Sequence, residues 1–348
     1  MKTVNTRSFP RAGFLGNPSD GYFGKTMSFA FSDYCVDLTL TESAKMRFVP
    51  GEVDDATFDS PEKLVRDIRL YGYYGGIRML KAVAKLFFEY CFENGIRLEN
   101  RNFTAEYRTN IPRLVGLSGS SAICSAMLKA LMKFYSVEIP LEHTPTICLE
   151  AEKLELGINC GFQDRVIQMY NGLVFMDFEK SFVEANNRGI YERLDPALLP
   201  NIYVAFDPNR AEESGKAHKK VKKLFEEKKP DILSAMSEFA DIAQKGRDAL
   251  VAGRKDLIAG LVNANFDLRD RIFNVAELNR NMVMTARESG ASAKFAGSGG
   301  AIVGTYEDEA QFAALSAKLA GIGCTTFKPS IALNDEAIPG SNTNWRSS

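Results

Sequence analysis

The chain has 348 residues, of which 45% are hydrophobic and 25% are charged, and its formal net charge is −1. This composition is typical of a folded globular protein, and the length favours two domains of roughly 150 to 200 residues each. The near-neutral charge excludes the basic footprint of a nucleic-acid-binding or membrane-surface protein. Basic and acidic residues alternate at helical spacing over 216–229, a pattern more typical of a solvated helix face than of a binding patch.

The cysteines and the first residues of the chain indicate a compartment. Six cysteines are scattered without a CxxC pair and five of them lie in apolar segments, so we expect six reduced thiols. The first eight residues are polar, and no apolar run approaches the roughly 18 residues that a membrane-spanning helix needs. We therefore expect a cytoplasmic protein without nucleic-acid or membrane partners. Only two histidines occur, so any chemistry should depend on carboxylates, basic side chains, hydroxyls and backbone amides.

The first half of the chain mixes strand and helix patterns. Apolar segments at 12–15 and 27–40, separated by a dense turn cluster, predict strand, loop and strand. Apolar residues spaced by three and four predict an amphipathic helix over 77–91. Alternation over 102–111 predicts a half-exposed strand, which leads into a glycine-rich loop and an apolar helix over 121–134. Further helices are expected over 141–156 and 161–169, and a strand over 173–178.

The second half of the chain has the pattern of an α+β sandwich. A strand is expected over 202–206, several helices over 213–289, and two strands joined by a glycine turn within 291–306. A helix over 308–320 and a strand over 324–328 follow. We accordingly divide the chain into an N-terminal domain, 1–195, and a C-terminal domain, 196–348.

The strongest candidate site is the segment 112–122, Pro-Arg-Leu-Val-Gly-Leu-Ser-Gly-Ser-Ser-Ala, between a predicted strand and a predicted helix. Glycines let backbone N–H groups approach a ligand closely, and the following helix N-terminus adds unpaired donors and partial positive charge, which suits phosphate. Ser120 and Ser121 could add hydroxyl donors or a magnesium ligand. The alternative is a plain connection with a helix cap. The spacing is not that of a Walker A loop, because no Gly-Lys-Ser/Thr follows.

Three segments, 10–20, 112–122 and 294–301, resemble the three ordered motifs of the GHMP kinases, and the resemblance extends over nearly the whole chain. It implies an α+β fold with an N-terminal mixed α/β domain and a C-terminal ferredoxin-like α+β domain. The second motif departs from the usual Gly-Leu-Gly-Ser-Ser by one more residue inside the turn, Ser118, which leaves open which serine ligates magnesium. The third motif has two interpretations. A tight hairpin would contain similar residues, but the position of this motif after the other two favours a loop that closes on the phosphates. The implied ATP contacts are Gly116, Leu117, Ser118, Gly119, Ser120, Ser121, Gly297, Ser298 and Gly299.

The segments 15–25, 72–76, 116–121 and 163–166 resemble the versions found in glucuronokinases, and Gly-Asn-Pro at 16–18 stands where most GHMP members carry Gly-Glu-His. This resemblance implies phosphorylation of the anomeric hydroxyl of D-glucuronic acid, with ATP and Mg²⁺ as cofactors and a small sugar acid as substrate. The alternatives are another uronic acid such as galacturonate, the decarboxylase branch of the superfamily, or a non-catalytic sugar sensor. The sensor is disfavoured because the residues of the phosphate loop and the expected base are present.

Asp164 lies at the start of a predicted helix, where a carboxylate is either a general base or a helix N-cap. The resemblance to galactokinase and mevalonate kinase implies the base. Glu152 resembles a magnesium-ligating glutamate of relatives, and its alternative is an exposed helix residue. With Ser121 it makes up the expected metal ligands. Arg11 stands where members place a cation that contacts the reacting oxygen, and its alternative is a structural ion pair.

A glucuronate substrate adds a carboxylate, so its site should contain a basic group. Lys25, Arg78 and Arg165 are the candidates, and the sequence does not rank them. Tyr73 and Tyr74, flanked by glycines, could contact the sugar or could pack as a surface turn. The expected substrate-binding residues are Asn17, Asp20, Lys25, Tyr73, Tyr74 and Arg165.

Overall fold

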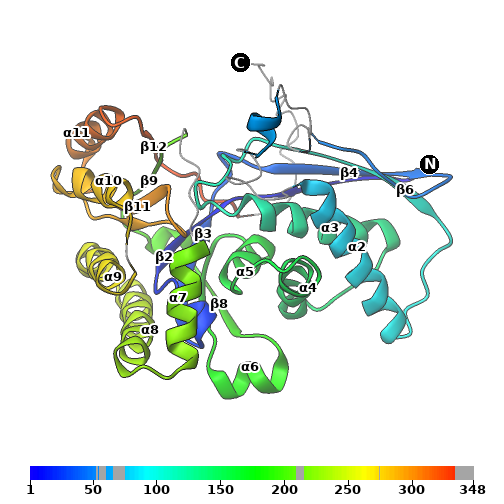
Figure 1. Ribbon diagram of the computed structural model, residues 1–348, viewed down its shortest axis with the longest axis horizontal. Helices are drawn as coiled ribbons and strands as arrows, with labels where there is room; N and C mark the ends of the chain where they lie inside the picture. The colour runs from blue at the N-terminus through cyan, green and yellow to red at the C-terminus, as the bar shows by residue number, and fades with distance from the viewer. Residues whose placement is uncertain (52–53, 55–59, 66–74, 209–214, 274, 334–348) are drawn as a thin grey trace.

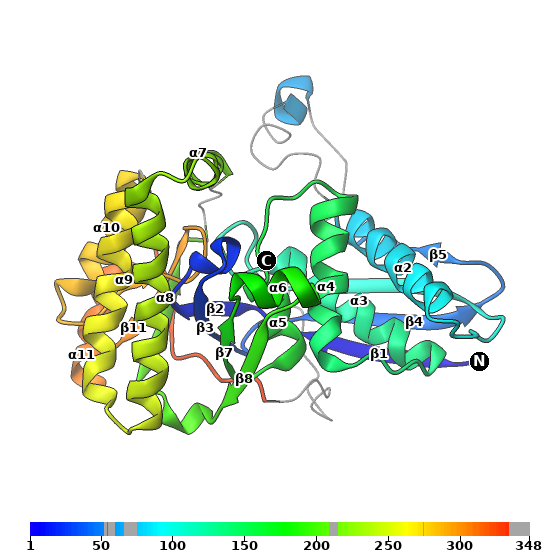
Figure 2. The ribbon, with the colours of Figure 1, turned by 90° about the horizontal axis from the view of Figure 1, so that it is seen from below.

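The computed structural model describes residues 1–51, 54, 60–65, 75–208, 215–273 and 275–333. Two lobes lie on either side of a central sheet (Figure 1, Figure 2). One lobe contains the N-terminal strands and helices α2 to α4, and the other contains helices α8 to α11 with strands β9 to β12. Within the described ranges no helix is long and apolar enough to cross a membrane.

The N-terminal lobe is built on a four-stranded sheet with the order β1-β4-β6-β5, in which only the β5–β6 pair is parallel. Burial alternates along β4, so one face is packed and the other is more exposed, as expected for a half-buried strand. Helices α2 and α3 pack on each other, and α3 lies against β1 and β4. The bounds are β1 (Thr3–Ser8), β4 (Val36–Ser43), β5 (Arg47–Phe48), β6 (Asn102–Thr109), α2 (Gly76–Glu93) and α3 (Gly119–Tyr135).

The central sheet has the antiparallel order β2-β3-β7-β8. It lies between α5 from the first half of the chain and α8 from the second, and all five residues of β2 are buried. This sheet therefore places the first residue of β2 and the start of α5 close to both lobes. The bounds are β2 (Arg11–Leu15), β3 (Lys25–Ala30), β7 (Leu173–Asp177), β8 (Ile190–Leu194), α5 (Gln163–Tyr170) and α8 (Pro230–Val251).

The C-terminal lobe contains an antiparallel sheet with the order β10-β11-β9-β12. Its helices pack with the sheet, and Phe266 and Phe295 meet edge to face in its core. The bounds are β9 (Ile202–Phe206), β10 (Lys294–Phe295), β11 (Ala301–Thr305), β12 (Thr325–Phe327), α7 (Gly215–Glu226), α9 (Ile258–Ile272), α10 (Glu277–Arg287) and α11 (Glu309–Ala320).

The C-terminal segment of the described chain returns to the first half, where the Ala332 amide donates to the Ala30 carbonyl at 2.9 Å. One hydrophobic cluster also joins Phe14 of β2 with Phe239 of α8 and Val303 of β11. The division into domains 1–195 and 196–348 remains a prediction.

The expected α+β fold is confirmed. The strand expected over 27–40 is wrong as a single element, because a turn at 31–35 divides it into β3 and β4, which belong to different sheets. The polar β1 was not predicted from its composition, and it forms because it pairs along its length with β4. All six cysteines are free thiols, and five are buried. The remaining elements are η1 (Ser19–Tyr22), η3 (Leu141–His143), α4 (Thr144–Glu150), the π-helical turn Ala151–Glu155, α6 (Lys180–Asn186), η5 (Pro196–Leu198) and η6 (Lys255–Leu257).

Candidate active site

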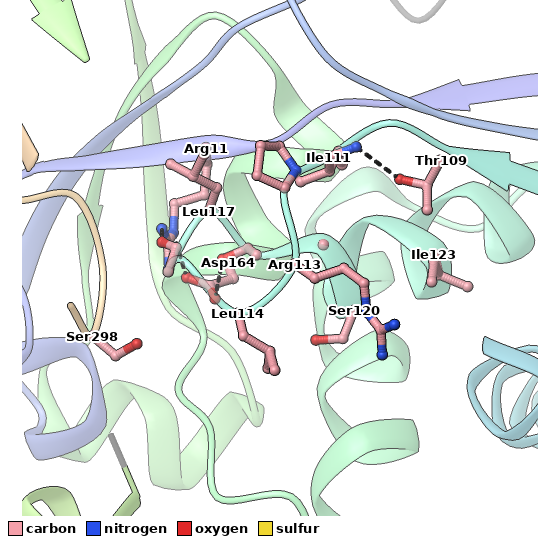
Figure 3. A pocket seen from close by; sticks show the side chains of 14 residues that line it. Arg11, Thr109, Ile111, Arg113, Leu114, Leu117, Ser120, Ile123, Asp164 and Ser298 are labelled. Carbon is pink, nitrogen blue, oxygen red and sulfur yellow. Dashed lines mark hydrogen bonds and ion pairs between the residues drawn. The ribbon is translucent and has the colours of Figure 1, made fainter. Parts of the chain in front are cut away.

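An ion pair between Arg11 and Asp164 joins the first residue of β2 to the start of α5. Arg11 Nε donates to Asp164 Oδ1 at 2.7 Å, and the two side chains are 6% and 20% exposed. Arg11 Nη1 donates to the carbonyl of Gly116 at 2.6 Å and to that of Ala296 at 3.1 Å. The guanidinium therefore touches residues of the second and third motifs and the expected base at once. Figure 3 shows Arg11 beside Asp164, with Ser120 and Ser298 on different sides of the cavity.

Asp164 is held in its ionised form. Burial opposes ionisation, but the charges of Arg11 and Arg165 and hydrogen bonds from Arg11 and Ser118 lower the pKa of Asp164 to about 2. Helix α5 has Phe162 at its N-cap position with no side-chain cap. The helix-cap alternative for Asp164 is therefore wrong, because its carboxylate faces the second motif instead.

The second and third motifs touch through their backbones. A β-carbon at Gly297 would lie 2.2 Å from the carbonyl oxygen of Gly116, and one at Gly116 would lie 2.5 Å from that of Gly299. Only glycine permits this approach. The third motif is a hairpin loop between β10 and β11, and it lies against the second motif. That it closes on the phosphates of ATP remains a prediction.

Two cavities meet at the ion pair. The smaller, of about 200 Å³, is lined by the glycine-rich loop of the second motif, including Gly116 to Ser120. The larger, of about 730 Å³, is lined by parts of the first motif and by the start of α5. Three residues line both cavities: Arg11, Asp164 and Ser298.

Asp20 lines the larger cavity close to the start of α5. Its Oδ2 accepts a hydrogen bond from the Gln163 amide at 3.2 Å, and a β-carbon at Gly161 would lie 2.0 Å from the same oxygen. Burial raises the pKa of Asp20 to about 6, and the negative charge of Asp164 adds to the shift. Two neighbouring carboxylates with separated pKa values are typical of sites that handle protons.

This separation predicts an acid limb in the rate profile. As pH falls through its pKa of about 6, Asp20 becomes protonated, so it loses the negative charge that strengthens the hydrogen bonds it accepts, and one of its oxygens becomes a donor. Asp164 stays ionised to about pH 2. We expect kcat/KM for the sugar, at saturating nucleotide, to fall roughly tenfold per pH unit below about 6. Asp20→Asn should have a lower but flat profile over pH 5 to 7. If that variant retains the wild-type limb, the limb belongs to another group.

Glu152 and Arg165 form a buried pair. Glu152 is 0% exposed, so the alternative of an exposed helix residue is wrong. Its Oε2 accepts from Arg165 Nε at 2.7 Å and also from Nη2, and Arg165 Nη1 donates to the Gly161 carbonyl at 2.9 Å. Arg165 is thus committed to protein acceptors, which does not favour direct binding of a substrate carboxylate. Glu152 lines neither cavity.

Other expected site residues lie at varying distances from the cavities. Ser120 lines the smaller cavity, whereas the buried Ser121 does not. Asn17 lines the larger cavity, and its Oδ1 accepts from Lys294 Nζ at 2.5 Å. Lys25 lines neither cavity and pairs with Asp177 at 2.9 Å. Arg78 also lies outside both cavities, and Tyr73 and Tyr74 fall outside the described residues.

Sequence analysis missed two residues one turn apart on α9. Asn265 accepts from the Gly16 amide at 2.6 Å and donates to the Asn17 carbonyl at 3.2 Å. Arg269 donates to the carbonyls of Gly297 and Ser298 at 3.0 and 3.1 Å. These side chains hold the first and third motifs. The sequence did contain a signal for them: Asn265 and Arg269 are polar residues four positions apart, so they lie on the same face of a helix.

Comparison with a solved structure and with a family model identifies the class of fold. The Lactococcus lactis galactokinase in complex with galactose superposes with a TM-score of 0.76 at 14% identity, covering 95% of this chain and 94% of that one. A family model described as "GHMP kinases N terminal domain" matches residues 78–172. The fold is therefore the two-domain fold of the GHMP kinases.

Two curated relatives narrow the class. The chain is 46% identical over 304 residues to "Probable glucuronokinase 2" of Arabidopsis thaliana, covering 85% of this chain and 82% of the relative. It is 44% identical over 306 residues to "Glucuronokinase 1" of the same plant, covering 86% and 84%. The chain belongs to the glucuronokinase family of the GHMP kinases and is a sugar kinase.

Proposed function

We propose that this sugar kinase transfers the γ-phosphoryl group of ATP to the anomeric hydroxyl of D-glucuronic acid, giving glucuronate 1-phosphate and ADP. The observation that carries the proposal is the meeting of two cavities at Arg11, Asp164 and Ser298. A nucleotide in one cavity and a sugar in the other would place the phosphoryl donor and the acceptor on either side of one ionised carboxylate. The two glucuronokinases of A. thaliana favour glucuronate as the sugar.

The smaller cavity suits the phosphates of ATP. Its wall is the glycine-rich loop before α3, whose first-turn N–H groups and helix dipole attract anions. Ser120 adds a hydroxyl donor at this wall. The α3 N-cap is Ser118, whose side chain makes no cap hydrogen bond, so the loop is more than a plain capped connection.

The larger cavity suits the sugar, with its reacting hydroxyl at Asp164. An ionised carboxylate whose pKa is about 2 is a weak base. It can accept the hydroxyl proton only as the bond to phosphorus forms and the hydroxyl becomes acidic, which agrees with the loose transition state of phosphoryl transfer. Among described residues, Arg11 Nη2 has no hydrogen-bond partner, and it is free to contact the transferring phosphoryl group.

The described residues do not fit a magnesium ion held by Glu152. The Arg165 guanidinium occupies Glu152 Oε2, and its positive charge would repel a cation there. The described part of the chain also contains no cluster of three or more histidine, cysteine, aspartate or glutamate side chains suited to a metal. Magnesium therefore enters this proposal as the ion that ATP brings on its own phosphates.

The uronate carboxylate needs a cation in the larger cavity, and two lysines are placed for this. Lys153, on the π-helical turn, and Lys222, on α7, are exposed and line the cavity. Neither forms an ion pair with any residue that the structure describes. Cys160 lines the same cavity, and its thiol lies within electrostatic range of both Asp164 and Lys153. We assign Lys153 as the main carboxylate contact, with Lys222 as a second one.

Lys153→Met should raise KM for glucuronate roughly tenfold, because it removes one charge-assisted hydrogen bond at an exposed site. The rate with glucose, which lacks the carboxylate, should change little. The matched control is Lys180→Met, an exposed lysine on α6 that lines neither cavity. Equal losses with glucose and glucuronate would remove Lys153 from carboxylate recognition.

The proposed function is tested with a panel of sugars, ATP and magnesium, measuring ADP release and the position of the phosphate by phosphorus and proton NMR. We expect glucuronate to have the highest kcat/KM and the product to carry phosphate on the anomeric oxygen. A preference for galacturonate would keep the chemistry and change the substrate. Phosphate on any other oxygen would overturn the proposal.

A further inference from the structure

We propose that Ser118 is a positioning residue that orients the carboxylate of Asp164, and that its hydroxyl is not a phosphate ligand. Ser118 Oγ donates to Asp164 Oδ2 at 2.5 Å. This inference rests on the proposed role of Asp164 as the group that accepts the substrate proton. It assigns a role to the one residue by which this loop is longer than the usual second motif.

Two residues of helix α5 form hydrogen bonds with Ser118. The Ser118 hydroxyl donates to Asp164, and the Ser118 carbonyl accepts from Gln168 Nε2 at 2.8 Å. Asp164 and Gln168 are one helical turn apart and lie on the same face of α5. The loop residue is therefore fixed relative to the base at both its side chain and its backbone.

The backbone of Ser118 gives a second, independent reason. Its φ is 64° and its ψ is 43°, the left-handed region that a residue with a β-carbon adopts at a cost in free energy and that glycine adopts freely. Glycine occurs at 116 and 119 in the same loop. Other non-glycine residues of this chain also have positive φ, but at Ser118 the conformation coincides with a hydroxyl that donates to Asp164, as with other strained residues at active sites.

The hydrogen bonds to Asp164 define what the serine does. Arg11 Nε occupies Oδ1 and Ser118 Oγ occupies Oδ2, so two donors fix the plane of the carboxylate. A carboxylate oxygen accepts more than one hydrogen bond, so Oδ2 keeps capacity for a substrate hydroxyl. Without the serine, Oδ2 would keep only the longer ion pair with Arg165 Nη1, at 3.7 Å, and the carboxylate could rotate away from the sugar.

The test uses two variants that remove the same hydroxyl, Ser118→Gly and Ser118→Ala. We expect kcat to fall roughly 10- to 100-fold in both, with KM for ATP and for the sugar within about threefold of wild type, because orientation of the base acts on the chemical step. Only Ser118→Gly relieves the backbone, so a shared loss of rate belongs to the hydroxyl. In an Asp164→Asn background, Ser118→Gly should lower kcat little further, because both changes act on one group.

Ser136→Gly is the matched control. Ser136 is a serine in the same left-handed conformation, with φ 55° and ψ 42°, at the other end of α3. It is exposed and lies outside both cavities. Ser136→Gly should raise the melting temperature, because glycine adopts the left-handed conformation without strain, and it should leave kcat unchanged.

Two results would overturn the inference. One is a kcat within threefold of wild type in either Ser118 variant, and the other is a selective rise in KM for ATP, which would return Ser118 to phosphate binding. The variants are compared with wild type on the best sugar of the panel. If glucuronate is not the substrate, the wild-type protein itself will show this in the sugar panel. If the inference about Ser118 is wrong, the ratio of variant to wild-type kcat on the best sugar will show it.

Discussion

Replacing Asp164 by asparagine is expected to lower kcat for sugar phosphorylation by roughly 10²- to 10⁴-fold, with much smaller changes in substrate affinity. Asparagine keeps the shape of the side chain and can still accept from Arg11 Nε, which lies 2.7 Å from Oδ1 in the wild-type protein. It cannot take a proton from the sugar hydroxyl. Stopped-assay measurement of ADP, with the fold checked by circular dichroism, gives the result.

Arg11→Met provides the companion experiment. We expect a lower kcat with nearly unchanged nucleotide affinity, because Arg11 lines both cavities and its charge would stabilise the negative charge that develops on the reacting oxygen. The double variant should lose less than the product of the two single losses, since both groups act at one oxygen. Turnover by Asp164→Asn at close to the wild-type rate would contradict the mechanism and leave positioning and charge as the source of catalysis.

Lys294→Met is expected to lower the free energy of unfolding by roughly 2 to 4 kcal/mol. Lys294 is buried, and its three ammonium protons match three acceptors: the Gly13 carbonyl at 2.6 Å, Asn17 Oδ1 at 2.5 Å and the Phe295 carbonyl at 2.7 Å. Methionine fills similar space but leaves those buried acceptors without a donor. Part of the loss is offset because burial and the charges of Arg269 and Arg11 lower the pKa of Lys294, so the buried ammonium is itself unfavourable.

The same substitution should also lower activity, because Lys294 is the first residue of the third motif and its hydrogen bonds join that motif to the first one. Urea unfolding measures the stability, and kcat/KM for both substrates measures the second effect. Lys25→Met is the control for stability, since Lys25 is a half-exposed lysine whose pair with Asp177 should contribute less than about 1 kcal/mol. If Lys294→Met unfolds at the same urea concentration as wild type, the three hydrogen bonds are not stabilising.

The local elements were largely predictable, and the contacts between them were not. The helix expected over 121–134 is α3, and the strand expected over 102–111 is β6, because hydrophobic spacing directly reflects which face is buried. The polar β1 was missed because its stability comes from pairing with β4, about 35 residues away. Glu152 and Arg165 were assigned to different ligands, yet they pair with each other through Glu152 Oε2, since the turn between them brings the two side chains together.

By itself the sequence determined the three glycine-containing segments and their order, because close approach of the backbone restricts the residues that a loop can contain. The candidate base came from the resemblance of these segments to the GHMP kinases. The tertiary structure decided which charged and polar groups remain available for ligands. Arg165 is committed to Glu152, Ser118 to Asp164, and Lys294 to the first motif, whereas Lys153 faces the larger cavity. The reason is physical: a hydrogen-bond partner is chosen by packing between segments that lie far apart in the chain, 281 residues in the case of Lys294 and Gly13. Residue type and local spacing do not encode that geometry.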